Sequence, residues 1–318
     1  MANSKPLQII YGDGTLGVTG PNCHYIFNYS RGGLESLVYA GKEWLYREPK
    51  PTFWRASTDN DRGNGFPQKA SQWLGAELFS VVKEIALQVN QKPISLPLAP
   101  ANNRYTAQEF AEEIQISFTY KTSTVPTTQV TVTYTVRSTG QLHVQAHYHG
   151  NHQLPELPRF GLEFVMPTLA TGFKYAGLSG ETYPDRMAGG VSGTYQIQGL
   201  PVTPYLVPQD NGIHMASHWL QISRQSTKDN SDLNRIPFQL KFSQGQKPFA
   251  FSALPYTALE LENASHQEDL PLPRRTVVTI LGAVRGVGGI DSWGADVAPA
   301  YRIPGDQDII FDFNIAGV

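Results

Sequence analysis

The chain has 318 residues, of which 40% are hydrophobic and only 16% are charged, and its formal net charge is −2. This composition is typical of a globular protein with a large core, and it excludes a disordered chain. No long basic stretch offers an electrostatic surface to DNA or RNA, so we expect no nucleic-acid partner. The one cysteine, Cys23, cannot form an intramolecular disulfide, which indicates a reducing compartment.

The N-terminal residues lack the apolar core of a secretory signal peptide, because residues 11–14 interrupt a short apolar run. No apolar run approaches the roughly 20 residues that a membrane-spanning helix needs. We therefore predict a cytoplasmic protein with no membrane partner.

Alternation of apolar and polar residues dominates the chain, and the alternating segments are rich in β-branched and aromatic residues. This period of two is typical of half-buried β-strands. The best helical candidate, residues 67–80, supplies a turn or two, and 23 prolines suit strands and turns better than helices. With no visible boundary, the sequence predicts one all-β domain over residues 1–318, a sandwich or a barrel. The clearest expected strands cover residues 114–120, 130–136, 142–149, 275–284 and 309–315.

A polar stretch follows Trp54-Arg55-Ala56 and reads Asp59-Asn60-Asp61-Arg62-Gly63-Asn64-Gly65. An EF-hand calcium loop would need a ligand and a glutamate where Gly63 and Ala70 stand, so that interpretation fails. We favour a turn in which the carboxylates and amides bond nearby backbone N–H groups. The glycines on either side of Asn64 predict that the following segment is a mobile loop.

Four histidines occur close together, and the first three share one strand face because their numbers differ by even steps. Imidazoles on one face can bind a metal, but no Cys, Asp or Glu lies nearby on that face of the strand. We therefore expect exposed strand histidines, with no metal and no cofactor bound by this chain. The four are His143, His147, His149 and His152.

Tyr183-Pro184-Asp185-Arg186 combines a proline, which fixes φ, with two charged side chains that can pair with each other or bond backbone groups. We expect a rigid connection with a satisfied polar network rather than direct chemistry.

Glycoside hydrolysis uses two carboxyl groups, about 5–5.5 Å apart for retention and about 6.5–9.5 Å apart for inversion. Glu260 and Glu262, read as neighbours on one strand face, would lie roughly 7 Å apart, but a solvated strand face explains them equally well. No Gly-x-Ser-x-Gly motif occurs, and Cys23 has no clear histidine partner. The chain therefore shows no convincing catalytic set of its own.

Residues 286–294 form a glycine-rich segment that follows an expected strand and carries Asp291, Ser292 and Trp293. It lacks the third glycine of a dinucleotide-binding motif and the Gly-Lys-Ser/Thr ending of a phosphate loop. Glycines let a backbone approach a ligand, Asp291 and Ser292 can pin the loop, and the flat ring of Trp293 can stack on a sugar. A core tryptophan beneath a loop explains the same pattern, so these residues alone leave both interpretations open.

Eight segments in a fixed order make a specific combination that no single one of them would make. They are Trp54-Arg55-Ala56, Asp59-Asn60-Asp61 with Gly63, residues 157–161, residues 175–178 with Glu181, Tyr183-Pro184-Asp185-Arg186, residues 203–205, residues 208–212 and residues 286–293. Together they resemble the C-terminal domain of the glycoside hydrolase family 2 β-galactosidases, and most closely the small subunit of the heteromeric (two-chain) bacterial β-galactosidases. Two positions depart from the family pattern, since Arg285 stands where Met is frequent and Ile290 where Asp is frequent.

The resemblance implies a β-supersandwich of large antiparallel sheets, like that of the galactose mutarotases. It implies that the catalytic glutamates and the magnesium and sodium sites lie in a barrel domain, for which this chain has no room. A large β-galactosidase subunit is therefore the expected partner, and a terminal β-galactoside such as lactose is the expected substrate. A mutarotase-like enzyme acting alone and a stand-alone carbohydrate-binding module are the alternatives.

The resemblance also assigns expected roles to individual residues. Trp293 is expected to form part of the sugar platform, with Asp291 and Ser292 beside it. The segment Gly63, Asn64 and Gly65 is expected to begin a loop that moves with the ligand. Structural or interface roles are expected for Asp59, Asn60, Asp61, Tyr183, Asp185 and Arg186.

Overall fold

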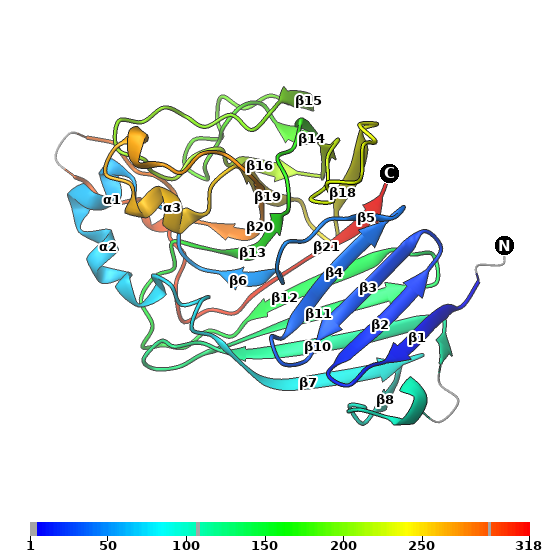
Figure 1. The fold of residues 1–318 in the computed structure, drawn as a ribbon. Helices are drawn as coiled ribbons and strands as arrows, with labels where there is room; N and C mark the ends of the chain where they lie inside the picture. Colours follow the sequence, from blue (N-terminus) through cyan, green and yellow to red (C-terminus); the bar gives the residue numbers. More distant parts are fainter. Residues whose placement is uncertain (1–4, 106–108, 292–293) are drawn as a thin grey trace.

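Antiparallel β-sheets make up most of the computed structural model, which describes residues 5–105, 109–291 and 294–318 (Figure 1). A six-stranded sheet runs in the order β5-β4-β3-β2-β1-β9. Its strands are β1 (Leu7–Tyr11), β2 (Thr15–Gly20), β3 (Cys23–Asn28), β4 (Gly33–Tyr39), β5 (Lys42–Glu43) and β9 (Phe110–Ala111).

The largest sheet among the described residues has ten strands in the order β15-β14-β17-β18-β21-β12-β11-β10-β7-β8. The C-terminal strand β21 lies between β18 and β12 and so joins the two halves of this sheet. The strands are β7 (Val81–Val89), β8 (Lys92–Ile94), β10 (Glu113–Lys121), β11 (Gln129–Arg137), β12 (Leu142–Tyr148), β14 (Gly172–Leu178), β15 (Ser192–Gln198), β17 (Trp219–Arg224), β18 (Phe238–Gln244) and β21 (Ile309–Gly317).

A five-stranded sheet runs in the order β16-β19-β20-β13-β6. Three short α-helices and a few 3₁₀ turns complete the described secondary structure. The strands of this sheet are β6 (Lys50–Thr52), β13 (Arg159–Met166), β16 (His214–Ser217), β19 (Phe249–Leu254) and β20 (Thr276–Val284). The helices are α1 (Asp59–Asn64), α2 (Phe66–Lys69) and α3 (Ala258–Asn263).

The alternation seen in the sequence becomes the burial pattern of the strands. Along β10, Ile114, Ile116, Phe118 and Tyr120 are buried, while the residues between them are partly exposed. The five strands expected from alternation correspond to β10, β11, β12, β20 and β21. The prediction of an all-β, antiparallel fold is confirmed, because every strand pair among the described residues is antiparallel.

Aromatic side chains on the buried face of the ten-stranded sheet pack against both smaller sheets. Phe27 of β3 contacts Tyr134 of β11, with ring centroids 5.5 Å apart. Phe164 of β13 contacts Phe242 of β18 at 5.3 Å. One large buried cluster therefore draws on all three sheets, which is the arrangement that the expected supersandwich requires. The assignment of residues 1–318 to a single domain stays a prediction.

Helices are few and short in the described part of the chain. The candidate over residues 67–80 overlaps α2 and contains the 3₁₀ turn Ser71–Trp73, so a turn or two is the right description. None of the helices in the described part of the chain is long and apolar enough to cross a membrane.

The prediction that Glu260 and Glu262 share a strand face is wrong, since both lie in α3. Thr257 caps this helix, and the Glu260 side chain bonds back to the Thr257 backbone to complete a capping box. The Thr-x-x-Glu spacing was a helix-start signal, but the alternation of Leu and Glu concealed it.

His214 of β16 is enclosed by aromatic rings. Its imidazole stacks on Phe251 at 4.8 Å, and its centroid lies 4.5 Å from that of Tyr175. Burial lowers the pKa of His214 from 6.5 to about 4. Between these two pH values the unfolded chain takes up a proton that the folded chain excludes, so the free energy of unfolding falls as the pH drops.

Replacing His214 with Phe tests this linkage. The ring contacts are retained and the titration is removed, so we expect a shallower decline in the free energy of unfolding between pH 6.5 and about 4. Urea denaturation at a series of pH values measures it, with the exposed His266→Phe as the matched control. Identical pH profiles for the wild type and His214→Phe would contradict the prediction.

Candidate functional site

Three segments that are far apart in the sequence meet around the loop that follows β20. They are the stretch from Arg55 through α1, residues 183–186, and residues 285–291. The helices α1, α2 and α3 gather on the same side of the sheets (Figure 1). Three of the motifs singled out in the sequence therefore lie together in the molecule.

A buried ion pair lies at the centre of this region. The guanidinium of Arg55 donates to both carboxylate oxygens of Asp61, with nitrogen–oxygen distances of 2.9 to 3.2 Å. Both residues are 1% exposed. Asp61 also accepts a hydrogen bond from the backbone N–H of Thr58, while the Thr58 hydroxyl accepts from Asp61 N–H, so the same carboxylate caps α1.

The remaining donors of Arg55 hold the loop after β20. One nitrogen donates to the carbonyl of Arg285 at 2.6 Å, and another donates to the carbonyl of Gly286 at 2.8 Å. Burial alone would lower the pKa of Arg55, but the carboxylates of Asp61 and Asp210 outweigh it and raise that pKa. Arg55 therefore stays charged and connects the start of α1 to the loop.

Asp185 holds the next residues of the loop. Its carboxylate accepts hydrogen bonds from the backbone N–H groups of Val287, at 3.0 Å, and Gly288, at 2.8 Å. The guanidinium of Arg186 donates to the carbonyl of Gly288. The interpretation of residues 183–186 as a rigid polar connection agrees with these bonds.

Asn60 reaches the loop from α1. Its side-chain amide donates to the carbonyl of Val287 at 2.8 Å. Gly289 lies directly beyond, with φ of +74°, and a Cβ atom there would come within 2.7 Å of the Asn60 amide nitrogen. Only glycine fits this position without displacing Asn60.

The segment Gly63, Asn64 and Gly65 is more regular than its composition indicates. Gly63 and Asn64 belong to α1, and Gly65, with φ of +73°, ends that helix and precedes α2. The prediction that all three residues lie in a loop is therefore wrong, because the Thr58 cap favours helix over loop. Motion of this segment stays a prediction.

A second group of buried polar side chains consists of Tyr183, Asp210 and Arg159. The Tyr183 hydroxyl donates to Asp210 at 3.0 Å, and Arg159 lies 3.9 Å from the same carboxylate. Burial raises the pKa of Asp210, and the charges of Arg159 and Arg55 oppose that shift. Asp59, on the exposed side of α1, pairs with Arg62 at 3.1 Å. Asp59 and Tyr183 thus each have a polar contact within the chain, and their structural or interface roles stay predictions.

Arg285, which departs from the family pattern, is fully buried and has its own partners. Its guanidinium donates to Glu156 and, at 2.6 Å, to Asp296. The guanidinium carbon lies 3.9 Å from the ring centroid of Phe66 in α2. Two carboxylates and an aromatic face therefore accommodate a charge where the family often has Met.

The tip of the loop is only partly described. The Asp291 carboxylate accepts a hydrogen bond from the backbone N–H of Ala295 at 3.0 Å. This bond joins residues four positions apart and closes the loop. Ile290, which stands where the family often has Asp, is 72% exposed and therefore lies at the surface. Ser292 and Trp293, both expected in the sugar site, lie outside the described residues.

Sequence reasoning assigned no role to two buried charged residues here, Arg159 and Asp210, and missed the contacts of the half-buried Glu262. Glu262 of α3 accepts from the Ser57 hydroxyl at 2.9 Å and from the Trp54 indole N–H at 3.2 Å. The sequence offered one signal for Arg159 and Asp210, because each belongs to a segment that carries the family resemblance. Glu262 belongs to none of these segments. Their partners become visible only in three dimensions.

The histidines on β12 do have carboxylate neighbours, so the prediction that none lies nearby on that face is wrong. His143 lies 3.0 Å from Asp312, and His147 lies 2.7 Å from Asp308. These aspartates come from β21 and the residue just before it. The sequence does not reveal this proximity, because β21 pairs with β12 although it is about half the chain away in sequence.

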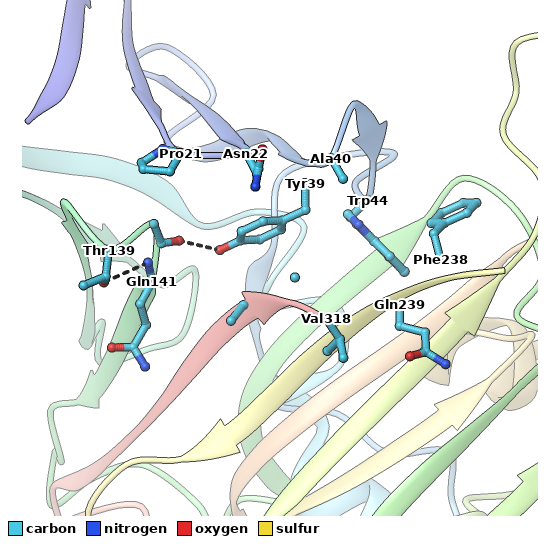
Figure 2. Close-up of a pocket in the computed structure, with 13 residues that line it drawn as sticks. Pro21, Asn22, Tyr39, Ala40, Trp44, Thr139, Gln141, Phe238, Gln239 and Val318 are labelled. Atoms are coloured by element: carbon cyan, nitrogen blue, oxygen red, sulfur yellow. Dashed lines mark hydrogen bonds between the residues drawn. The ribbon is translucent and has the colours of Figure 1, made fainter. Parts of the chain in front are cut away.

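A hollow in the surface lies elsewhere, beside the C-terminal strand (Figure 2). Its volume is about 660 Å³, and its walls include Tyr39, Trp44 and Phe238 with the amides of Gln141 and Gln239. None of the residues that line it has a carboxylate, imidazole or thiol side chain. It therefore offers no acid–base pair of side chains. None of the residues that surround the loop after β20 lines it.

Comparison with known proteins gives the family. Residues 19–315 match the family model described as "Beta galactosidase small chain". The chain is 57% identical over 317 residues to a "Beta-galactosidase small subunit" of Latilactobacillus sakei, which covers 99% of this chain and 100% of that protein. The chain therefore belongs to the β-galactosidase small chain family, and the resemblance seen in the ordered segments is confirmed.

Longer proteins and solved structures also match. A "Beta-galactosidase" of Streptococcus thermophilus is 32% identical over 312 residues, which cover 98% of this chain but only 28% of that protein. A solved structure of a putative aldose 1-epimerase from Escherichia coli is 10% identical, covering 98% of this chain and 99% of the other, with a TM-score of 0.44.

Replacing Asp61 with Ala tests the buried ion pair. The Arg55 charge would be left buried without its carboxylate, so we expect a loss of about 3–5 kcal/mol in the free energy of unfolding. Asp59→Ala, two residues away on the exposed side of the same helix, should change little. Urea denaturation of both variants measures the difference, and equal losses would contradict the assignment.

Proposed function

We propose that this chain is the small subunit of a two-chain β-galactosidase that hydrolyses terminal β-D-galactosides such as lactose. The observation that carries the proposal is one of length. The chain aligns along its whole length with a small subunit, yet spans 28% of a longer β-galactosidase. The remaining part of such an enzyme, with its chemistry, would come from a large subunit.

The catalytic glutamates belong on the large subunit in this proposal. Within the described residues, Glu260 pairs with Arg275 at 2.6 Å and Glu262 bonds the Ser57 segment, so both are engaged in structure. Two carboxyl groups on the large subunit would cleave the bond with retention through a covalent glycosyl-enzyme. The family resemblance implies that the magnesium and sodium sites also lie on that subunit.

The contribution of this chain is the loop after β20. Arg55, Asn60 and Asp185 hold residues 285–288 through their backbone groups, and Asp291 closes the loop at its tip. A loop anchored in this way can present Trp293 in one orientation, with its ring stacked on the galactosyl unit. Asp291 and Ser292 are proposed to lie beside that ring. The cytoplasmic location stays a prediction.

Purifying the chain alone and with its large subunit tests the proposal. The isolated chain should not hydrolyse a chromogenic β-galactoside, and addition of the large subunit should restore hydrolysis, because the catalytic carboxylates lie on the other chain. Robust hydrolysis by the isolated chain would overturn the division of labour. Accelerated mutarotation of fresh α-galactose, or tight galactose binding by the isolated chain in calorimetry, would favour the mutarotase or binding-module alternative.

Trp293→Ala in the assembled enzyme tests the platform. Loss of one stacking face should weaken galactoside binding by about 1–3 kcal/mol, read as a rise in KM or a fall in kcat/KM. Trp219→Ala on β17 is the matched control, since that indole packs against Lys241 on the sheet. Unchanged kinetic constants in Trp293→Ala would remove this residue from the sugar site.

A further inference from the structure

Two histidines and one aspartate converge on the outer face of the ten-stranded sheet. His147 lies near the end of β12, His149 follows that strand, and Asp308 directly precedes β21. One ligand atom from each lies within 4.8 Å of those of the other two. The imidazole rings of His147 and His149 are 3.9 Å apart between centroids, and the Asp308 carboxylate lies 2.7 Å from Nε2 of His147.

From this geometry we infer that His147, His149 and Asp308 form a binding site for a divalent transition-metal ion, Zn²⁺ foremost. Two imidazoles and one carboxylate are the donor set that borderline ions of the first transition row favour, whereas Mg²⁺ and Ca²⁺ prefer all-oxygen sets. The site goes beyond the proposed role of the chain in galactoside cleavage and does not depend on it.

The surroundings fix the carboxylate for this role. Oδ1 of Asp308 accepts a hydrogen bond from the backbone N–H of Gly150 at 2.8 Å, which leaves Oδ2 directed at His147. Such a bond to a ligand's second atom is how protein metal sites commonly orient their ligands. The His149 backbone is bonded on both sides, since its N–H donates to the carbonyl of Gln129 and its carbonyl accepts from Thr128.

The ligands need only small side-chain rotations to close on an ion. Zinc bonds of about 2.0–2.2 Å in a tetrahedron separate the ligand atoms by roughly 3.4 Å, compared with the present spread of up to 4.8 Å. Asp308 is 55% exposed and His147 27% exposed in their side chains, so water has access to complete the coordination. An ion here would connect β12 to the start of β21, the strand that joins the two halves of the largest sheet.

The same face provides a matched control. His143 and Asp312 form another histidine–aspartate pair between β12 and β21, with 3.0 Å between Nε2 and Oδ2. That pair belongs to no three-ligand group among the described residues. His143→Ala removes an imidazole from the same strand without touching the proposed site.

Calorimetric titration of the full chain, without an affinity tag, with ZnCl₂ tests the site. We expect one ion per chain, at least a tenfold loss of affinity in His149→Ala and in Asp308→Asn, and unchanged affinity in His143→Ala. Zn²⁺ should also raise the midpoint of thermal unfolding of the wild type but not of His149→Ala, because an ion that binds only the folded chain stabilises it. Titration with MgCl₂ should give no comparable signal.

Co²⁺ provides a second readout that does not depend on stability, since a tetrahedral cobalt site absorbs visible light more strongly than hydrated Co²⁺. No saturable binding of Zn²⁺ or Co²⁺ by the folded wild type would overturn the proposal. Binding that survives unchanged in both His149→Ala and Asp308→Asn would also overturn it, since the ion would then lie elsewhere.

Discussion

The buried ion pair between Arg55 and Asp61 is the interaction on which this region of the protein depends. Removing two charges from water is costly, and it is offset only where every donor and acceptor has a partner. Here the carboxylate pairs with the guanidinium and caps α1, and the guanidinium also holds two carbonyls of the loop after β20. The conformation of that loop is therefore coupled to the start of the helix.

The neighbouring contacts use the same principle, in which a side chain satisfies backbone groups that have no partner in a sheet. Asp185 accepts from two N–H groups of the loop, Asn60 donates to a carbonyl, and Glu262 holds the segment before α1. A loop outside a sheet has unpaired backbone polar groups, and buried side chains are their main source of partners. This explains why short polar motifs far apart in the sequence belong to one site.

The supersandwich fold leaves room for these side-chain contacts to the backbone. Its ten-stranded sheet covers both smaller sheets with one aromatic face, which leaves the edges and the connections between strands free for polar groups. The opposite face of the same sheet is partly exposed and holds the histidines of β12 beside the aspartates near β21. The two faces thus carry different chemistry, because successive residues of a strand point to opposite sides.

The sequence by itself predicted five of the strands, the all-β class and the family, because alternation and short motifs are carried by residues next to one another. It was misleading at Glu260 and Glu262, where alternating Leu and Glu concealed a capped helix, and at Gly63 and Asn64, which are helical despite the glycine. Only the tertiary structure decided which charges meet. Asp308 reaches His147 across 161 positions because β21 inserts beside β12, and the order of strands in a sheet leaves no local trace in the sequence.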